Sequence, residues 1–388
     1  MKAGNRRCSD VIPVTCSQAD FWRARAARIL PLYGASPKTS IDSRNLDFLR
    51  TVAVLCVFVT HLINYLSGTG QADVRGIPFH LLGQTGVLLF FVHTALVLMM
   101  SMERMTSRNL VTNFYVRRFF RIYPLSVACI GAVLLFHIPW GFTFSPFSWK
   151  EIVASLFLVQ NLFPTYRSIS APLWSLPFEV QMYLMLPAIF FLLKRVPSKL
   201  TVLLLWVAVC GAQPFAPLLL EYAPCFLGGV LAYQLAKERT FALPGWVLPT
   251  SMFALFVLYV LLKFTVLPDS RSDYLLCMFL GGIIPNVTEF KRSRLTRACH
   301  VLAKYSYGIY LGHALVFWLC FVKLSFLPIA AQLLLMIPLM FVVPFAAYKL
   351  IETPFIAIGR RFTSQKELQH ASHRRQFAAP PPLLPRSP

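Results

Sequence analysis

Charged residues, and acidic residues above all, are scarce in this 388-residue chain. Only 13% of the residues are charged, and just 15 are Asp or Glu. A soluble globular protein carries about 25% charged residues, which cover its surface with groups that water solvates. Here 57% of the residues are hydrophobic, and the mean hydropathy is +0.62. This composition excludes a chain that folds entirely in water.

Cysteine motifs are missing as well. None of the nine cysteines forms a CxxC pair, and most fall within apolar segments. This placement favours small buried side chains over a disulfide framework or a metal site. We therefore expect neither disulfides nor a bound metal.

The sequence does contain a series of apolar blocks long enough to cross the ~30 Å hydrocarbon core of a bilayer as helices. They predict an all-α, polytopic integral membrane protein with about ten transmembrane helices. The predicted spans are residues 46–66, 79–100, 122–138, 174–193, 200–216, 217–235, 246–267, 273–288, 300–322 and 328–350. Residues 150–163 are too few to cross, and we interpret them as a re-entrant or interfacial segment.

The net charge of +22 lies mostly in the terminal segments and in short loops between the apolar blocks. This pattern is typical of topology signals and of contact with anionic membrane lipids, not of nucleic-acid binding. With both termini cytoplasmic, the inner loops hold fourteen basic residues and the outer connections five. The inner ones are Arg104, Arg108, Arg117, Arg118, Arg121, Lys194, Arg195, Lys199, Lys237, Arg239, Lys291, Arg292, Arg294 and Arg297; the outer ones are Arg75, Lys150, Arg167, Arg271 and Lys323.

Composition also divides the chain into three parts. Residues 1–43 predict a basic cytoplasmic arm, and residues 44–355 a transmembrane domain. Residues 356–388 are basic and rich in proline, and they predict a disordered cytoplasmic tail.

Polar residues recur on one face of the first span. Arg50 and His61 are eleven residues apart, which is three helical turns, and Asp47 lies on the same stripe. Ionisable groups at this depth usually face a protein interior or a water-filled cavity. A histidine that merely hydrogen-bonds between helices is the alternative.

Two further groups of residues can carry chemistry. Arg118 and Arg121 share a helix face at the inner start of the third span, where they can grip phosphates or simply act as a stop-transfer signal. Ser175, Glu179 and Tyr183 recur every four residues in the fourth span. Counted from the outer face, Glu179 and His61 lie at similar depths, so we predict that they meet, with Glu179 fixing the tautomer of a catalytic histidine. A purely structural interhelical pair is the alternative.

Two other histidines lie in apolar surroundings. His93 follows Phe90-Phe91-Val92, and His313 ends the segment Ser306-Tyr-Gly-Ile-Tyr-Leu-Gly. For both we favour a packing role.

In these segments the chain resembles the membrane-bound acyltransferase-3 family. Six motifs occur in the family's order across residues 44–355. They are Arg44 to Ala53 followed by His61, Gly83 to Val92, Arg117 to Pro124, Leu173 to Tyr183, Ser306 to His313, and Ile351 to Phe355. The family's Leu-Ser-Gly-Phe is replaced by His93 to Leu96, and Val180 stands where the family often has a second Glu, so the chain resembles a divergent subgroup of the family.

The resemblance implies a membrane-bound O-acyltransferase in the bacterial cytoplasmic (inner) membrane. Such an enzyme moves an acyl group, commonly acetyl, from cytoplasmic acyl-CoA to a hydroxyl of an extracytoplasmic carbohydrate or glycolipid. His61 and Glu179 would be catalytic. Arg50, Arg118 and Arg121 would hold acyl-CoA, while Trp174, Ser175 and Tyr183 would contact the substrate. The alternative is a transporter or flippase without acyl transfer, which would also have many spans and buried charges.

The asymmetry of basic residues predicts the topology. Reporter domains fused after Lys199 and at the C-terminus should both read cytoplasmic, because only an even number of spans keeps the basic loops inside. An extracytoplasmic signal at either position contradicts this arrangement.

Overall fold

The computed structural model describes residues 43–68, 78–105, 109–139, 145–238, 241–267 and 269–363. Within these ranges the chain is helical and has no strand; one isolated bridge pairs Leu243 with Val287. The predicted all-α fold is confirmed. Of the predicted N-terminal arm, only Ser43 falls inside the described ranges.

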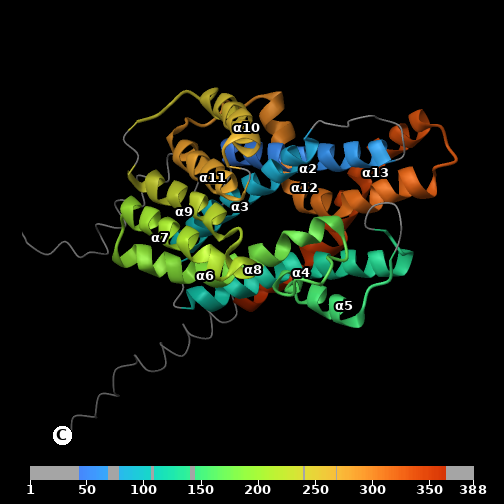
Figure 1. Ribbon diagram of the computed structural model, residues 1–388, viewed down its shortest axis with the longest axis horizontal. Coiled ribbons are helices and arrows are strands. Elements are labelled where there is room, and N and C mark those ends of the chain that lie inside the picture. The colour runs from blue at the N-terminus through green and yellow to red at the C-terminus, as the bar shows by residue number, and fades with distance from the viewer. Residues whose placement is uncertain are drawn as a thin grey trace, which may run out of the picture.

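Figure 1 labels the helices in chain order. They are α2 (Arg44–Gly68), α3 (Phe79–Arg104), α4 (Leu110–Phe136), α5 (Trp149–Leu156), α6 (Leu176–Arg195), α7 (Lys199–Ala212), α8 (Pro217–Leu220), α9 (Ala223–Glu238), α10 (Val247–Thr265), α11 (Arg271–Ile283), α12 (Arg294–Phe317) and α13 (Ile329–Ala347). The π-helical turns η6 (Trp318–Lys323) and η7 (Tyr348–Glu352) extend α12 and α13.

A helix occupies each of the ten predicted positions, but eight of the described helical stretches are long and apolar enough to cross a membrane. They are Arg44–Gly68, Phe79–Arg104, Leu110–Phe136, Ala171–Arg195, Pro217–Glu238, Val247–Thr265, Arg294–Lys323 and Ile329–Thr363. The other two, α7 and α11, have 14 and 13 residues. At ~1.5 Å per residue each rises only about 20 Å.

The short segment after α4 folds as predicted, without a spanning helix. Its helix α5 has eight residues and begins with a capping box between Ser148 and Glu151. Burial opposes ionisation of Glu151, but hydrogen bonds from Ser148 and Arg167 outweigh it and lower the pKa of Glu151 to about 2. The carboxylate thereby ties the start of α5 to the loop that leads to α6.

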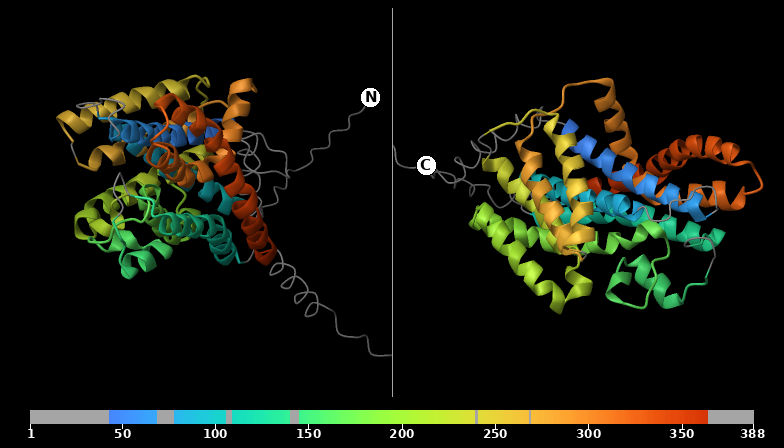
Figure 2. Two further views of the ribbon diagram at one scale, coloured as in Figure 1. Left: turned by 90° about the vertical axis from the view of Figure 1, so that its right-hand side faces the viewer. Right: turned by 45° about the horizontal axis from the view of Figure 1, so that its top comes forward.

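The last helical stretch corrects the predicted tail. Residues 353–363 continue the helix beyond η7, so the part of the tail from 356 to 363 is ordered helix. Figure 2 shows this stretch, in red, running from the group of helices around α12 down along the group around α4. Its basic residues had suggested solvation, but the helix packs on α4 through η7. Residues 364–388 lie outside the described ranges.

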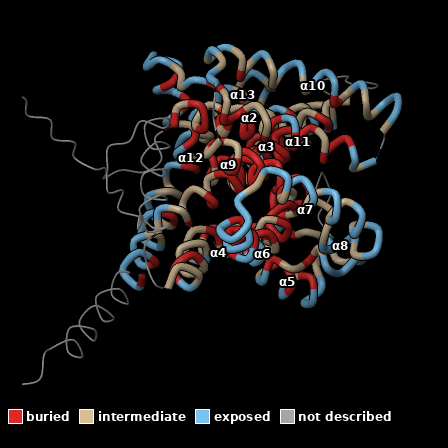
Figure 3. Tube along the Cα trace, turned by 90° about the vertical axis from the view of Figure 1, so that its left-hand side faces the viewer, coloured by how far each residue is buried: buried red, intermediate tan, exposed pale blue. Residues whose placement is uncertain are grey.

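The core is centred on α3, which packs against α2, α6, α9 and α11. Figure 3 shows buried residues concentrated around α3 and α9, while α10 and α13 carry many exposed positions. Exposed Phe253 and Phe341 on those outer helices are apolar, as expected of side chains that face lipid. The buried cysteines Cys225 and Cys277 are free thiols.

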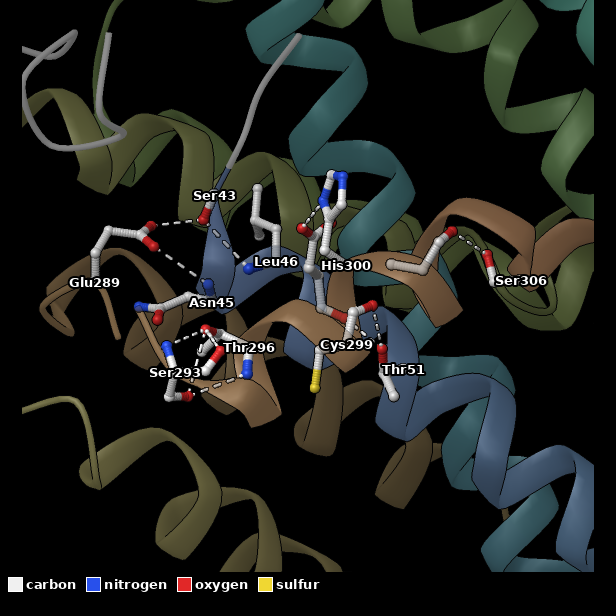
Figure 4. A network of polar contacts seen from close by, with 12 residues as sticks. Ser43, Asn45, Leu46, Thr51, Glu289, Ser293, Thr296, Cys299, His300 and Ser306 are labelled. Atoms are coloured by element: carbon white, nitrogen blue, oxygen red, sulfur yellow. Dashed lines mark hydrogen bonds and ion pairs between the residues drawn. The ribbon is translucent and has the colours of Figure 1, made fainter. Parts of the chain in front are cut away.

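Polar contacts fix the start of α2 against the loop before α12 (Figure 4). Ser43 Oγ donates to Glu289 Oε1 at 2.6 Å, and Asn45 bonds the backbone of Thr288 and Phe290. One turn later, Asp47 Oδ2 lies 2.8 Å from His300 Nδ1. Asp47 therefore belongs to this junction, and the register of α2 relative to α12 is set here.

Glycines let α9 and α11 approach each other closely. A Cβ atom at Gly281 would lie 2.0 Å from the Gly228 carbonyl oxygen, whereas one at the next residue, Gly282, would meet nothing within 4 Å. Such contact with backbone can be relieved only by separating the helices.

We expect Gly281→Ala to lower the melting temperature of the detergent-solubilised protein, with a cost of at least about 1–3 kcal/mol from overpacking. Gly282→Ala is the matched control on the same helix and should be neutral or slightly stabilising. Equal melting temperatures for the two variants would contradict the close approach of α9 and α11.

Candidate functional site

A cavity of 760 Å³ lies between the helices and carries an unusual excess of positive charge. Its wall includes six arginines and, among the described lining residues, one carboxylate, Glu179. The arginines are Arg50 from α2, Arg104 from α3, Arg117, Arg118 and Arg121 from α4, and Arg360 from the last helical stretch. A cavity with this charge balance is suited to a ligand that carries several negative charges.

The predicted arginine pair lies on the cavity wall. Arg118 and Arg121 are three residues apart on α4, and both face the cavity, as the spacing predicted. Arg121 forms an ion pair with the buried Glu352 at 3.4 Å. Within the described part of the chain, Nε of Arg118 and Nε of Arg50 are buried without a hydrogen-bond partner. Two guanidinium groups thus keep donor capacity available for a ligand.

The polar stripe that begins at Ser175, the residue before α6, also lines the cavity. Ser175, Glu179 and Tyr183 all line the cavity, which confirms that they share one face. Ser175 Oγ lies 2.7 Å from the Tyr310 hydroxyl. The Tyr183 hydroxyl donates to Glu179, whose carboxylate also feels the charges of Arg50 and Arg118.

The predicted contact between His61 and Glu179 does not occur in the described structure. Glu179 lies beside Tyr183, Arg50 and Arg118, whereas the ring of His61 lies 5.0 Å from that of His313. The prediction compared depths only, and equal depth does not make two residues neighbours. Helix α2 packs on α3 and α12, and α6 packs on α3, α4 and α9.

Trp174, the third residue predicted to contact the substrate, does not line the cavity. Its ring packs against Tyr222 at 5.6 Å and Phe178 at 6.3 Å between centroids. Trp174 supports the start of α6, next to Ser175.

Several cavity residues were missed by reasoning from the sequence. His93 lines the wall, although an apolar neighbourhood had suggested packing. Arg104 and Arg117 had been counted only as topology signals, and Arg360 had been placed in a disordered tail. Tyr307 and Tyr310 line the wall from α12. Their three-residue spacing, which places them on one face, was the available signal.

Comparison with known proteins identifies the chain's relatives. A family model described as an acyltransferase domain matches residues 43–349. The acyltransferase MdmB of Streptomyces mycarofaciens is 30% identical over 169 residues, which cover 42% of this chain and 43% of that protein. No solved structure matches the chain. Since the family model covers most of the chain, this protein belongs to the acyltransferase-3 family of multi-pass membrane proteins.

Proposed function

We propose that this acyltransferase moves an acyl group, acetyl in the simplest case, from acyl-CoA to a hydroxyl of a carbohydrate or glycolipid acceptor beyond the cytoplasmic membrane. The observation that carries the proposal is the cavity with six arginines and one carboxylate. CoA is a polyanion with several phosphates, and arginine pairs with phosphate through two parallel hydrogen bonds. The family assignment and the unpaired Nε atoms of Arg50 and Arg118 support the same donor.

The distance along α2 suits this donor. Arg50 lines the cavity, and His61 lies eleven residues further, about 16 Å along the helix. An extended pantetheine arm can bridge such a distance when the phosphates lie among the arginines. The thioester then lies beside the part of the wall that Ser175 and Tyr310 form.

The reaction needs one proton acceptor. His61 removes the proton of the acceptor hydroxyl as its oxygen attacks the thioester carbonyl. The carbon–sulfur bond breaks, the ester oxygen stays on the acceptor, and the proton held by His61 passes to the departing CoA sulfur. Glu179 does not react; it balances the charges of Arg50 and Arg118 across the cavity.

Labelled donor tests the function directly. Membranes that contain the protein should move radiolabel from [acetyl-¹⁴C]acetyl-CoA to a glycan or glycolipid fraction, and membranes without it should not. Label that stays in CoA while a polar solute or lipid crosses the membrane would favour the transporter instead.

The donor site predicts a kinetic phenotype for the arginine pair. Arg118→Ala combined with Arg121→Ala should raise the KM for acetyl-CoA at least tenfold, because each charge-assisted phosphate contact contributes about 1.5–3 kcal/mol. The matched control is Arg294→Ala with Arg297→Ala, an exposed pair with the same spacing at the start of α12. If the Arg118→Ala, Arg121→Ala variant is present at a normal level and its KM for acetyl-CoA is unchanged, the two arginines do not bind the donor and serve as a stop-transfer signal.

The base predicts a different phenotype. His61→Ala and His61→Gln should both lower kcat by roughly 10²–10⁴, the usual contribution of a positioned base. Glu179→Gln should keep more activity, because Glu179 only balances charge. His80→Gln, an exposed histidine at the start of α3, controls for a general effect of histidine loss. Normal turnover by well-folded His61→Gln would exclude His61 as the base.

A further inference from the structure

His313 is buried in the seam between α2 and α12, and one of its ring nitrogens is already committed. The side chain is 1% exposed, and its Nδ1 lies 3.1 Å from the Ile309 carbonyl oxygen one turn earlier. A carbonyl only accepts hydrogen bonds, so Nδ1 carries the proton. In the neutral ring Nε2 is therefore an acceptor with a free lone pair.

That acceptor is unsatisfied. Within the described chain, Nε2 of His313 is buried and has no hydrogen-bond partner. A buried polar atom left unpaired costs about 1–3 kcal/mol, so such an atom calls for an explanation. The nearest ring that can donate an N–H is His61, whose centroid lies 5.0 Å away with the planes tilted by 37°.

The surroundings of the two rings are otherwise aromatic. Phe317 lies 5.6 Å from His313, and it also packs against Phe58 and Tyr65, which flank His61 on α2. Tyr310 is a further aromatic neighbour, and its ring lies 6.3 Å from that of His313. Tyr310 lines the cavity and bonds Ser175, so Tyr310 stands between the histidine pair and the cavity wall, of which neither histidine is a part.

We propose that His313 is the positioning residue of His61: its Nε2 accepts the N–H of His61 and leaves the other nitrogen of His61 free to act as the base. This proposal rests on the proposed function and replaces Glu179 as the group that sets the tautomer of His61. In many enzymes a third residue orients the general base through a hydrogen bond. Such hydrogen bonds often reach their final length only when substrate is bound.

His61 takes up and releases one proton in the reaction, and the protonation state of His313 does not change. Neutral His61 shares its N–H with His313 and takes the hydroxyl proton on its other nitrogen. The resulting imidazolium keeps the first bond and releases the second proton to the CoA sulfur. His313 stays neutral throughout, held by Ile309.

Two variants of similar shape separate orientation from packing. His313→Asn keeps a donor near Nδ1 for the Ile309 carbonyl but lacks an acceptor at the position of Nε2. His313→Gln places an amide oxygen near that position. We expect His313→Asn to lower kcat at least tenfold with an unchanged KM for acetyl-CoA, and His313→Gln to recover most of the loss.

The double variant tests whether His313 acts through His61. Adding His313→Asn to His61→Ala should cause no further loss, because the residue that His313 orients is already gone. Equal activity of the Asn and Gln variants, or an additional loss in the double variant, would overturn the proposal. So would a lowered melting temperature that accounts for the whole effect.

A readout without turnover distinguishes this proposal from the proposed function. In ¹⁵N spectra of histidine-labelled protein, the His61 signals are assigned by their loss in His61→Gln. One neutral tautomer of His61 should dominate in the wild type and become mixed in His313→Asn. An unchanged tautomer ratio overturns the positioning role, whether or not acetyl-CoA is the donor; failure of the donor alone leaves the spectra as expected.

Discussion

Uncompensated positive charge inside a membrane-spanning bundle is the constraint on which the rest of this structure depends. Among the described residues, six arginines and a single carboxylate line one cavity, and charges of this kind are costly away from water unless they are paired. The described chain pairs only part of them. The anionic donor that we propose would supply the missing charge, and its binding would stabilise the bundle around the cavity.

The arginines differ in whether a protein group already pairs with them. Arg121 is held by buried Glu352, which the π-helical turn η7 carries toward α4. Turns of this type often occur at functional sites, because the extra residue redirects side chains. Arg118 and Arg50 keep a free Nε instead. Glu352 thus orients the guanidinium of Arg121, and its charge also acts on Arg50.

Features that depend only on helical periodicity and on composition can be predicted from the sequence. Helical spacing placed Arg118 and Arg121 on one face, and likewise the three polar residues of α6, and the structure agrees because neither statement requires knowledge of a neighbouring helix. Block length gave the helix positions for the same reason.

Lateral neighbours could not be predicted in this way. The proposed contact of His61 with Glu179 used depth, which is set by the membrane, while contact is set by helix packing order. Arg360 shows a second limit. Its surroundings are rich in charge and resemble a solvated tail, yet a helix with one charged edge also has this composition when that edge faces a cavity. His93 shows the converse, since an apolar segment can border a cavity at a single position.

Helix α2 carries both Arg50 of the cavity wall and His61, the base that we propose. Its start is tied to the loop before α12 by Ser43 and Asn45, and then by Asp47 to His300. Thirteen residues further along α12, His313 meets His61, fourteen residues beyond Asp47 on α2. The two helices therefore run parallel over nearly equal lengths from the junction to the histidines. The junction thereby fixes the position of His61 relative to His313. Arg50 belongs to the same helix, so α2 sets the distance between the arginines and His61. If acyl-CoA is the donor, as we propose, α2 thereby sets the length that its pantetheine arm has to span between the arginines and the base.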